Sequence, residues 1–143
     1  MAPKVRSFEA RDVARVHEMG ITVPEFAAGP EHRFWPQATL ERFAEQGLSC
    51  VVEDATDVVG FLLASYQPIT EKLTWDNMYL ASGYRGQGLA DVCFQESWRR
   101  AQLQGAKIAE SWIARDNDPS QKMLKRLGFQ DCGTYRWMLK FAK

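Results

Sequence analysis

Apolar side chains recur with two periods along the first third of the chain, one typical of strands and one typical of helices. Residues Lys4 to Phe8 can form a short first strand. The segment EARDVARVHEM that follows predicts a helix, because its apolar residues have helical spacing: Val13, Val16 and Met19. Residues 20–37 hold three prolines among aromatic residues and are expected to be irregular. A second helix is predicted over 39–46, ending at Gly47.

The middle of the chain predicts a hairpin followed by a strand, a glycine loop and a long helix. The runs LSCVVED and VVGFLLASY are rich in β-forming residues and are separated by Ala55, Thr56 and Asp57, as in an antiparallel hairpin. A further strand is predicted over 73–80. In ASGYRGQGLADVCFQESWRRAQLQG the apolar positions then recur every three or four residues, which predicts a helix that Gly105 closes.

The last third predicts a buried strand over 107–114, a short helix over 119–127 that ends at Gly128, and a final strand over 135–141. The resulting order is β, α, α, β, β, β, α, β, α, β, an α+β mixture. Within it, the strand, helix, strand unit over 73–114 is expected to be parallel with a right-handed crossover.

Composition narrows the class of protein without identifying it. With 143 residues, 45% of them hydrophobic, the chain is expected to form one domain, 1–143, with one core. The 18 basic and 18 acidic residues cancel, so no global field favours nucleic acid or an anionic membrane. Three dispersed cysteines without a histidine cluster suggest free thiols and no metal site. Neither a signal peptide nor a membrane-spanning run is recognised, so we expect a cytoplasmic protein.

The glycine loop before the long helix carries the first chemical signal. Gly86 and Gly88 allow consecutive backbone N–H groups to converge on one point, since glycine has no Cβ to block the approach. The helix dipole and Arg85 add positive charge there, so a pyrophosphate is the expected ligand. Walker A and dinucleotide-binding loops fit poorly, because neither Leu89-Ala90 nor the position in the chain supplies their pattern.

The segment MYLASGYRGQGLADVCFQE resembles the cofactor-binding motif Q/R-x-x-G-x-G/A of the GNAT N-acetyltransferase superfamily, with Arg85, Gly88 and Ala90 in its fixed places. Residues 117–129, NDPSQKMLKRLGF, resemble the second conserved block of that superfamily at the usual distance. The resemblance implies a mixed, twisted sheet of six to seven strands with about four helices on both faces, splayed after residue 80. It also implies acetyl-CoA as cosubstrate.

The resemblance further implies which residues bind the cofactor. Backbone N–H groups of the loop would hold the pyrophosphate: Gly86, Gln87, Gly88, Leu89 and Ala90, beside Arg85. The backbone of the preceding strand would pair with the pantetheine arm: Met78, Tyr79 and Leu80. Asn117 would contact the cofactor beyond the thioester, and the Ser120 hydroxyl would add a contact; Asn117 could instead simply cap the helix that follows.

The chemistry requires a base, since an alkyl amine with a pKa of about 10.4 is protonated at neutral pH. Asp76 falls where the superfamily often carries an acid, although it could also face solvent or cap a bulge, and Glu53 and Glu71 are rivals. The backbone N–H of Met78 would stabilise the oxyanion. Leu124 stands where many members carry a tyrosine acid, and the sequence cannot rank the substitutes: Tyr79, Tyr84 and Tyr135.

Three functions remain open at this stage: an N-acetyltransferase on a small-molecule amine, which leads; an N-acetyltransferase on protein α-amino or lysine groups; and a non-catalytic acyl-CoA sensor. The aromatic segment over 26–35 is the best candidate for an acceptor lid, although such aromatic residues more often pack in a core. A homodimer through the C-terminal strand is common in the superfamily, yet YRWMLKF could equally be an internal strand.

Overall fold

The computed structural model describes residues 2–27, 34–140 and 142. It divides into two compact units, Met1–Trp112 and Ile113–Lys143, which are described separately. Residues 28–33 of the expected irregular segment, and Phe141 of the expected last strand, lie outside the described residues.

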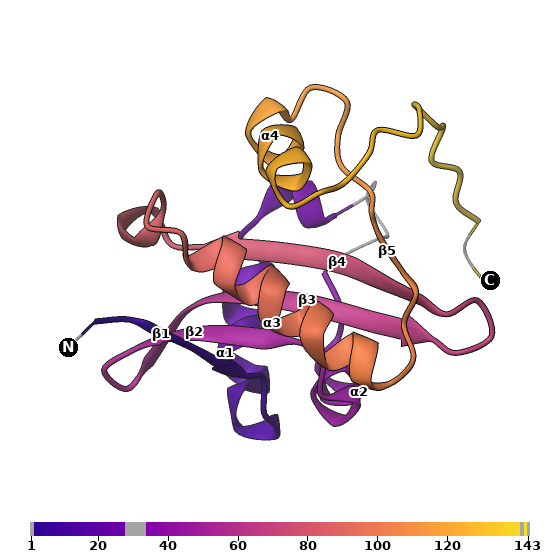
Figure 1. The fold of residues 1–143 in the computed structure, drawn as a ribbon. Helices are drawn as coiled ribbons and strands as arrows, with labels where there is room; N and C mark the ends of the chain where they lie inside the picture. Colours follow the sequence, from indigo (N-terminus) through magenta and orange to yellow (C-terminus); the bar gives the residue numbers. More distant parts are fainter. Residues whose placement is uncertain (1, 28–33, 141, 143) are drawn as a thin grey trace. The chain divides into compact units, whose positions relative to one another are not determined.

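The first unit is built on a five-stranded sheet in the order β1-β2-β3-β4-β5 (Figure 1). The strands are β1 Lys4–Ser7, β2 Cys50–Asp54, β3 Asp57–Gln67, β4 Lys72–Leu80 and β5 Ile108–Ser111. The first four strands pair antiparallel in chain order, and β5 pairs parallel to β4. The predicted hairpin and the predicted parallel unit are therefore confirmed.

Two helices cover one face of this sheet. They are α1 Val13–Gly20, which follows the 3-10 turn η1 Ala10–Asp12, and α2 Gln37–Gln46, which ends at Gly47 with a left-handed φ of 73°. The 3-10 turn η2 Pro24–Phe26 lies between the two helices. Their apolar sides join inward-facing strand residues in one buried cluster that includes Val16, Leu40, Phe61 and Leu63. Burial of these side chains is the main force holding this layer together.

The long helix α3 Leu89–Leu103 covers the opposite face, in front of the sheet in Figure 1. Its buried residues include Phe94 and Ser97. Trp75 of β4 packs edge-on against Phe94 at 4.4 Å between ring centroids and donates a 3.0 Å hydrogen bond from Nε1 to Ser97 Oγ. The sheet thus carries helices on both faces, as expected.

The β4–β5 ladder is short, and this shapes the site. The register joins Lys72 to Ile108 and ends where Trp75 meets Ser111, although β4 itself continues to Leu80. The expectation that the splay begins after residue 80 is therefore wrong, because β5 has only four residues and its pairing stops at Trp75. The remaining five residues of β4 have an edge that β5 does not pair.

The second unit contains α4 Asp118–Arg126, capped by Asn117. The strand predicted over 135–141 is wrong for residues 135–140, which form neither helix nor strand. The described sheet accordingly has five strands where six to seven were expected. Aromatic and apolar residues favour a strand, but a strand also needs a neighbour for its backbone hydrogen bonds.

Candidate active site

The loop between β4 and α3 has the backbone geometry expected of an anion-binding turn. Gly86 and Gly88 adopt φ of 76° and 79°, left-handed values that side chains rarely adopt. Gly88 is also the N-cap of α3, and it offers no side-chain hydrogen bond to the first helical turn. A Cβ built on either glycine would meet open space, so the loop presents its backbone outward. These features fit a phosphate group at the positive end of the helix.

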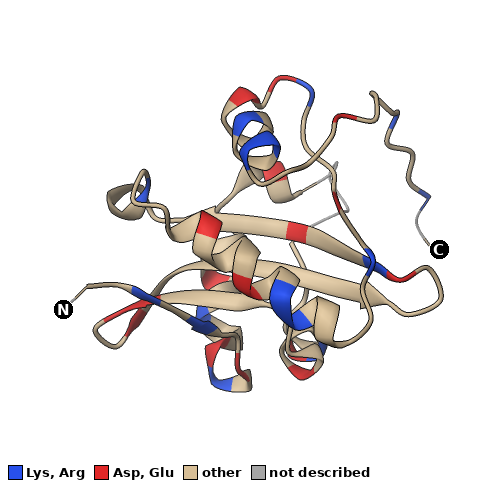
Figure 2. Cartoon of the chain, viewed as in Figure 1, with Lys and Arg blue, Asp and Glu red and all other residues tan. Residues whose placement is uncertain are grey.

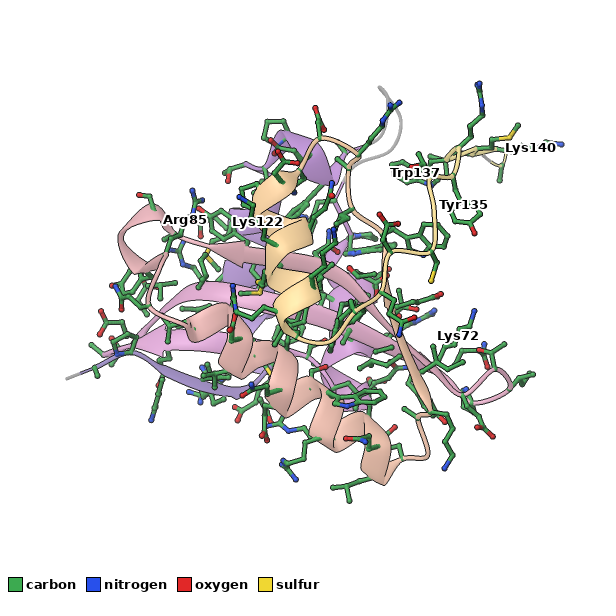
Figure 3. All side chains as sticks on the ribbon, turned by 45° about the horizontal axis from the view of Figure 1, so that its top comes forward. Lys72, Arg85, Lys122, Tyr135, Trp137 and Lys140 are labelled. Atoms are coloured by element: carbon green, nitrogen blue, oxygen red, sulfur yellow. The ribbon has the colours of Figure 1, made fainter. Side chains whose placement is uncertain are left out.

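Arg85 lies in this loop (Figure 3), but part of its guanidinium has a structural role. Its Nε donates a 2.9 Å hydrogen bond to the carbonyl oxygen of Leu80, the last residue of β4. The side chain is exposed, so its terminal nitrogens can still face an anion in solvent. The 3-10 turn η3 Ser82–Tyr84 leads into the loop, and Gln87 Nε2 bonds back to the Gly83 carbonyl at 3.2 Å.

The backbone of β4 presents alternate residues to its unpaired edge. The N–H of Ala81 donates a 2.9 Å hydrogen bond to the Val59 carbonyl on β3. Because antiparallel ladders alternate every second residue, Tyr79 also directs its backbone groups to β3, whereas Met78 and Leu80 direct theirs to the opposite edge. The bond from Arg85 to the Leu80 carbonyl agrees with this direction. Met78 thus directs its backbone N–H to the edge of β4 that β5 does not pair, and its role as an oxyanion donor stays a prediction.

Asp76 is the extra residue of a β-bulge. Leu63 pairs with Asn77 and the next residue of β3, Ala64, pairs with Trp75, so Asp76 has no partner of its own on β3. A bulge places two successive side chains on about the same face of a strand, which turns Asp76 and Asn77 toward the α1 and α2 side. Bulges re-aim side chains next to active sites, and this one lies directly before the unpaired edge of β4.

The carboxylate of Asp76 is held in place and has a raised pKa. Ser65 Oγ on β3 donates a 2.8 Å hydrogen bond to Asp76 Oδ2. Burial raises the pKa of Asp76, the Ser65 hydrogen bond opposes this, and the negative charge of Glu110 raises it further. Glu110 itself accepts a 3.1 Å hydrogen bond from Thr74 and lies 3.5 Å from Lys72. A carboxylate with a raised pKa accepts a proton more readily, which suits a general base.

The neighbouring Asn77 connects the bulge to the expected acceptor lid. Trp35 Nε1 donates a 2.7 Å hydrogen bond to Asn77 Oδ1, and the indole packs on Phe43 of α2 at 5.7 Å between ring centroids. Phe34, by contrast, is a core residue that stacks on Phe26 at 5.6 Å. Trp35 is half-buried, so it both touches β4 and keeps exposed surface.

The two rival acids lie outside the bulge. Arg6 Nε donates a 2.9 Å hydrogen bond to Glu53, and this bond holds the pKa of the Glu53 carboxyl below its usual value. Glu71 lies in the turn before β4, where its carbonyl accepts from the N–H of Lys107 at 2.9 Å. Glu53 therefore forms an ion pair with Arg6 between β1 and β2. Asp76, by contrast, lies in the bulge of β4, where the pairing with β5 has ended.

The tyrosines proposed as acids occupy different surroundings. Tyr84 donates a 2.6 Å hydrogen bond to Asp54 on β2, and this bond raises the pKa of Tyr84. Tyr79 packs on Phe61 at 5.9 Å between ring centroids, on the same face as Asn77. Tyr135 belongs to the second unit, where its hydroxyl donates to the Cys132 carbonyl at 3.3 Å.

In the second unit, Asn117 acts as the helix cap that the sequence left as an alternative. Its Oδ1 accepts a 3.2 Å hydrogen bond from the backbone N–H of Ser120, in the first turn of α4. This contact uses one lone pair of Oδ1 and leaves the amide group for other partners. A cofactor role for Asn117 and the Ser120 hydroxyl stays a prediction.

Sequence reasoning missed the partners of Asp76 and Asn77. Ser65, Trp35 and Glu110 come from three separate segments, and no local spacing links them to β4. The odd-numbered residues of β4 show where the bulge lies. Leu73 and Trp75 face α3, whereas Asn77 and Tyr79 face α1 and α2. The alternation therefore breaks at Asp76.

Both signs of charge are interspersed along the sheet and helices of the first unit (Figure 2). This agrees with the formal net charge of zero. Among the residues that the structure describes, no helix combines the length and apolar character needed to cross a membrane.

A sequence model described as the acetyltransferase (GNAT) family matches residues 17–129. A streptothricin acetyltransferase from Streptomyces lavendulae is 30% identical over 77 residues, which are 54% of this chain and 41% of that protein. The match thus spans less than half the length of that relative.

Solved structures share the fold at lower identity. A diaminobutyrate acetyltransferase from Paenibacillus lautus, in complex with L-2,4-diaminobutyric acid and coenzyme A, is 22% identical with a TM-score of 0.73, covering 88% of this chain and 74% of its own. The aminoglycoside acetyltransferase AAC(6')-Iy, with a bisubstrate analogue, is 16% identical with a TM-score of 0.71 over 99% and 100%. The ribosomal-protein-S18-alanine N-acetyltransferase of Escherichia coli is 15% identical with a TM-score of 0.69 over 92% and 80%.

Proposed function

The chain belongs to the acetyltransferase (GNAT) family, and we propose that it transfers an acetyl group from acetyl-CoA to the amine of a small molecule. The observation that carries this proposal is the bulge at Asp76. It sets a half-buried carboxylate of raised pKa directly before the edge of β4 to which Met78 directs its backbone N–H. A base and an oxyanion donor are thereby close together along one strand.

The residues of the first unit fit acetyl-CoA at this edge. The left-handed Gly86 and Gly88, with the uncapped first turn of α3, suit a pyrophosphate. The outward carbonyl of Met78 and the outward N–H of Leu80 suit the amide-containing pantetheine arm, which can pair with a strand edge as a further strand would. When bound, acetyl-CoA supplies the thioester carbonyl that the amine attacks.

The chain's own groups then have separate tasks. Asp76 takes the proton that a protonated amine must lose, held in position by the Ser65 hydroxyl. The Met78 N–H donates a hydrogen bond to the oxygen that gains negative charge. Thiolate with a pKa of about 8.5 is a tolerable leaving group, so the leucine at position 124 does not preclude transfer.

A small-molecule acceptor is favoured by Trp35 and by the relatives. Trp35 presents an aromatic surface fixed beside Asp76 and Asn77, which suits a compact organic cation. The streptothricin, diaminobutyrate and aminoglycoside acetyltransferases named above act on small amines. The ribosomal-protein enzyme shows that the same fold also serves a protein acceptor.

The test is release of free CoA thiol from acetyl-CoA in the presence of small amines, amino acids and short peptides, with mass spectrometry of the product. Turnover with a small amine that exceeds turnover with every peptide supports the proposal. Peptide acetylation alone would move the chain to the protein-modifying class. Binding of acetyl-CoA without transfer to any acceptor would instead indicate a sensor.

A further inference from the structure

The glycine loop requires support from outside itself. Gly86 and Gly88 sample many backbone conformations in isolation, so an anion site built on them binds well only when the loop is held in one of these. Holding the loop before the ligand arrives removes an ordering cost from binding. Contacts from other parts of the first unit must therefore hold the loop.

One contact reaches across the sheet. Tyr84, the residue directly before Arg85, donates a 2.6 Å hydrogen bond to Oδ2 of Asp54. Asp54 ends β2, and β3 lies between β2 and β4 in the sheet, so the bond spans a strand. A hydroxyl that bonds to a carboxylate at this distance forms a strong, charge-assisted hydrogen bond.

The acceptor of this bond stands on a fixed support. Asp54 and Asp57 face each other across the β2–β3 turn, at the end of the ladder that joins these two strands. The loop entry is fixed separately, because the Ala81 N–H bonds to the Val59 carbonyl. Tyr84 thus joins the middle of the loop to a hairpin that the sheet already holds.

We propose that Tyr84 and Asp54 form a positioning pair that holds residues 85–90 in the conformation that binds the pyrophosphate of acetyl-CoA, without touching the cofactor. The inference rests on the proposed function, since it concerns the same loop. It assigns Tyr84 a different role from the acid considered from the sequence. The pair acts on cofactor affinity, and the transfer step does not depend on it.

Two substitutions break the pair from opposite sides: Tyr84→Phe removes the donor, and Asp54→Ala removes the acceptor. Asp54→Asn keeps a side-chain oxygen that can accept from the phenol. Asp57→Asn is the matched control, because it changes an acid on the same turn that Tyr84 does not bond. Each variant is first checked for folding by thermal unfolding without ligand.

The measurements are the dissociation constant of CoA by calorimetry and the binding of pantetheine, which lacks the pyrophosphate, by ligand-observed NMR. We expect Tyr84→Phe and Asp54→Ala to weaken CoA about tenfold, the loss typical of one charge-assisted hydrogen bond. Pantetheine binding should not change. Asp54→Asn should bind CoA more tightly than Asp54→Ala, and Asp57→Asn should match the wild type.

A double-mutant cycle completes the test. Tyr84→Phe combined with Asp54→Ala should lose no more CoA affinity than either single variant, because both remove the same bond. Unchanged CoA affinity in the single variants, additive losses, or an equal loss for pantetheine would overturn the positioning pair. Failure of the wild-type chain to bind CoA would contradict the proposed function instead, so the two failures are distinguishable.

Discussion

The indole Nε1 of Trp35 donates a 2.7 Å hydrogen bond to Oδ1 of Asn77, the residue that follows Asp76 in the β4 bulge. This bond fixes an aromatic side chain from the segment before α2 beside the proposed base. The bulge therefore has two consequences: it turns Asp76 toward Ser65, and it turns Asn77 toward Trp35.

Loss of the Trp35–Asn77 bond should weaken acceptor binding. Asn77→Ala and Trp35→Phe each remove one partner, and we expect KM for the acceptor to rise about fivefold to tenfold, the value of one hydrogen bond. Asn77→Asp keeps the accepting oxygen and should retain most of the affinity. Steady-state kinetics at saturating acetyl-CoA measure this, and a fall in kcat with unchanged KM would contradict it.

Asp76→Asn should abolish most of the transfer rate. The amide retains the shape of the side chain but cannot take a proton, so kcat/KM should fall by about 100-fold or more. CoA affinity should stay unchanged. Glu71→Gln is the matched control, because it neutralises a rival acid in the turn before β4 and should have little effect. Wild-type rates in Asp76→Asn would remove the base assignment and leave the fold intact.

The pH profile should report the raised pKa of Asp76. A base must be ionised, so kcat/KM should decline as pH falls through this pKa, which lies above the usual value for an aspartate. Glu110→Gln removes the negative charge that helps to raise the pKa of Asp76, so this pKa should fall. The acidic limb of the profile should therefore move to lower pH. A move to higher pH would contradict the role of the Glu110 charge in raising the pKa of Asp76.

Gly88→Trp should lose acetyl-CoA binding with little loss of fold. Its φ of 79° disfavours any side chain, at a cost of about 1–2 kcal/mol, and a large ring would cover the outward N–H groups of the loop. Gly83→Ala is the control, since that glycine lies in the same loop without a left-handed φ. Calorimetry with CoA compares the two, and tight binding by Gly88→Trp would exclude this loop as the pyrophosphate site.

The Arg6–Asp12 pair should contribute to the acid sensitivity of the fold. Arg6 donates two 2.8 Å hydrogen bonds to Asp12, whose side chain is 5% exposed. Asp12→Ala should lower the free energy of unfolding by about 2 kcal/mol, because it removes two charge-assisted hydrogen bonds from a partly buried guanidinium that keeps Glu53 as a partner. Asp57→Asn, which breaks an exposed pair with Arg15, should cost less than about 1 kcal/mol. Urea unfolding of both variants checks the contrast.

The sign of the pH dependence follows from the same network. Burial raises the pKa of Asp12, but the Arg6 hydrogen bond and the Glu9 backbone N–H outweigh it, and the pKa is lowered in the folded state. A lowered carboxyl pKa stabilises the fold above the unfolded value and loses this effect as pH falls through the folded value. Stability should therefore decline below about pH 4 in the wild type. In Asp12→Ala this decline should be smaller.

Local signals predicted most of the first unit. The C-cap of α2 at Gly47 and the start of α3 after Gly88 could be predicted because both positions are glycines. Glycine is the residue that most readily adopts the left-handed conformation found there. The hairpin and the parallel unit follow from spacing and handedness. Such features depend on residues close together in the chain, so one sequence is sufficient to find them.

The bulge and the short β4–β5 ladder could not be found in this way. Both depend on the register between strands, and Ser65 meets Asp76 only because β3 and β4 shift by one residue between Leu63 and Ala64. The strand predicted at residues 135–140 is wrong for a related reason. A run of aromatic and apolar residues favours a strand, but a strand forms only where another strand pairs with its backbone. Motif residues were therefore easier to predict than the contacts that position them.

The most direct test of the central claim is thermal unfolding of the chain with and without acetyl-CoA. Ligand at about a hundred times its dissociation constant adds about 2.7 kcal/mol to the free energy of unfolding, so the melting temperature should rise by several degrees. Gly88→Trp should show no such rise. Unchanged melting of the wild-type chain at millimolar acetyl-CoA would contradict the assignment of the loop and, with it, the proposed acetyl transfer.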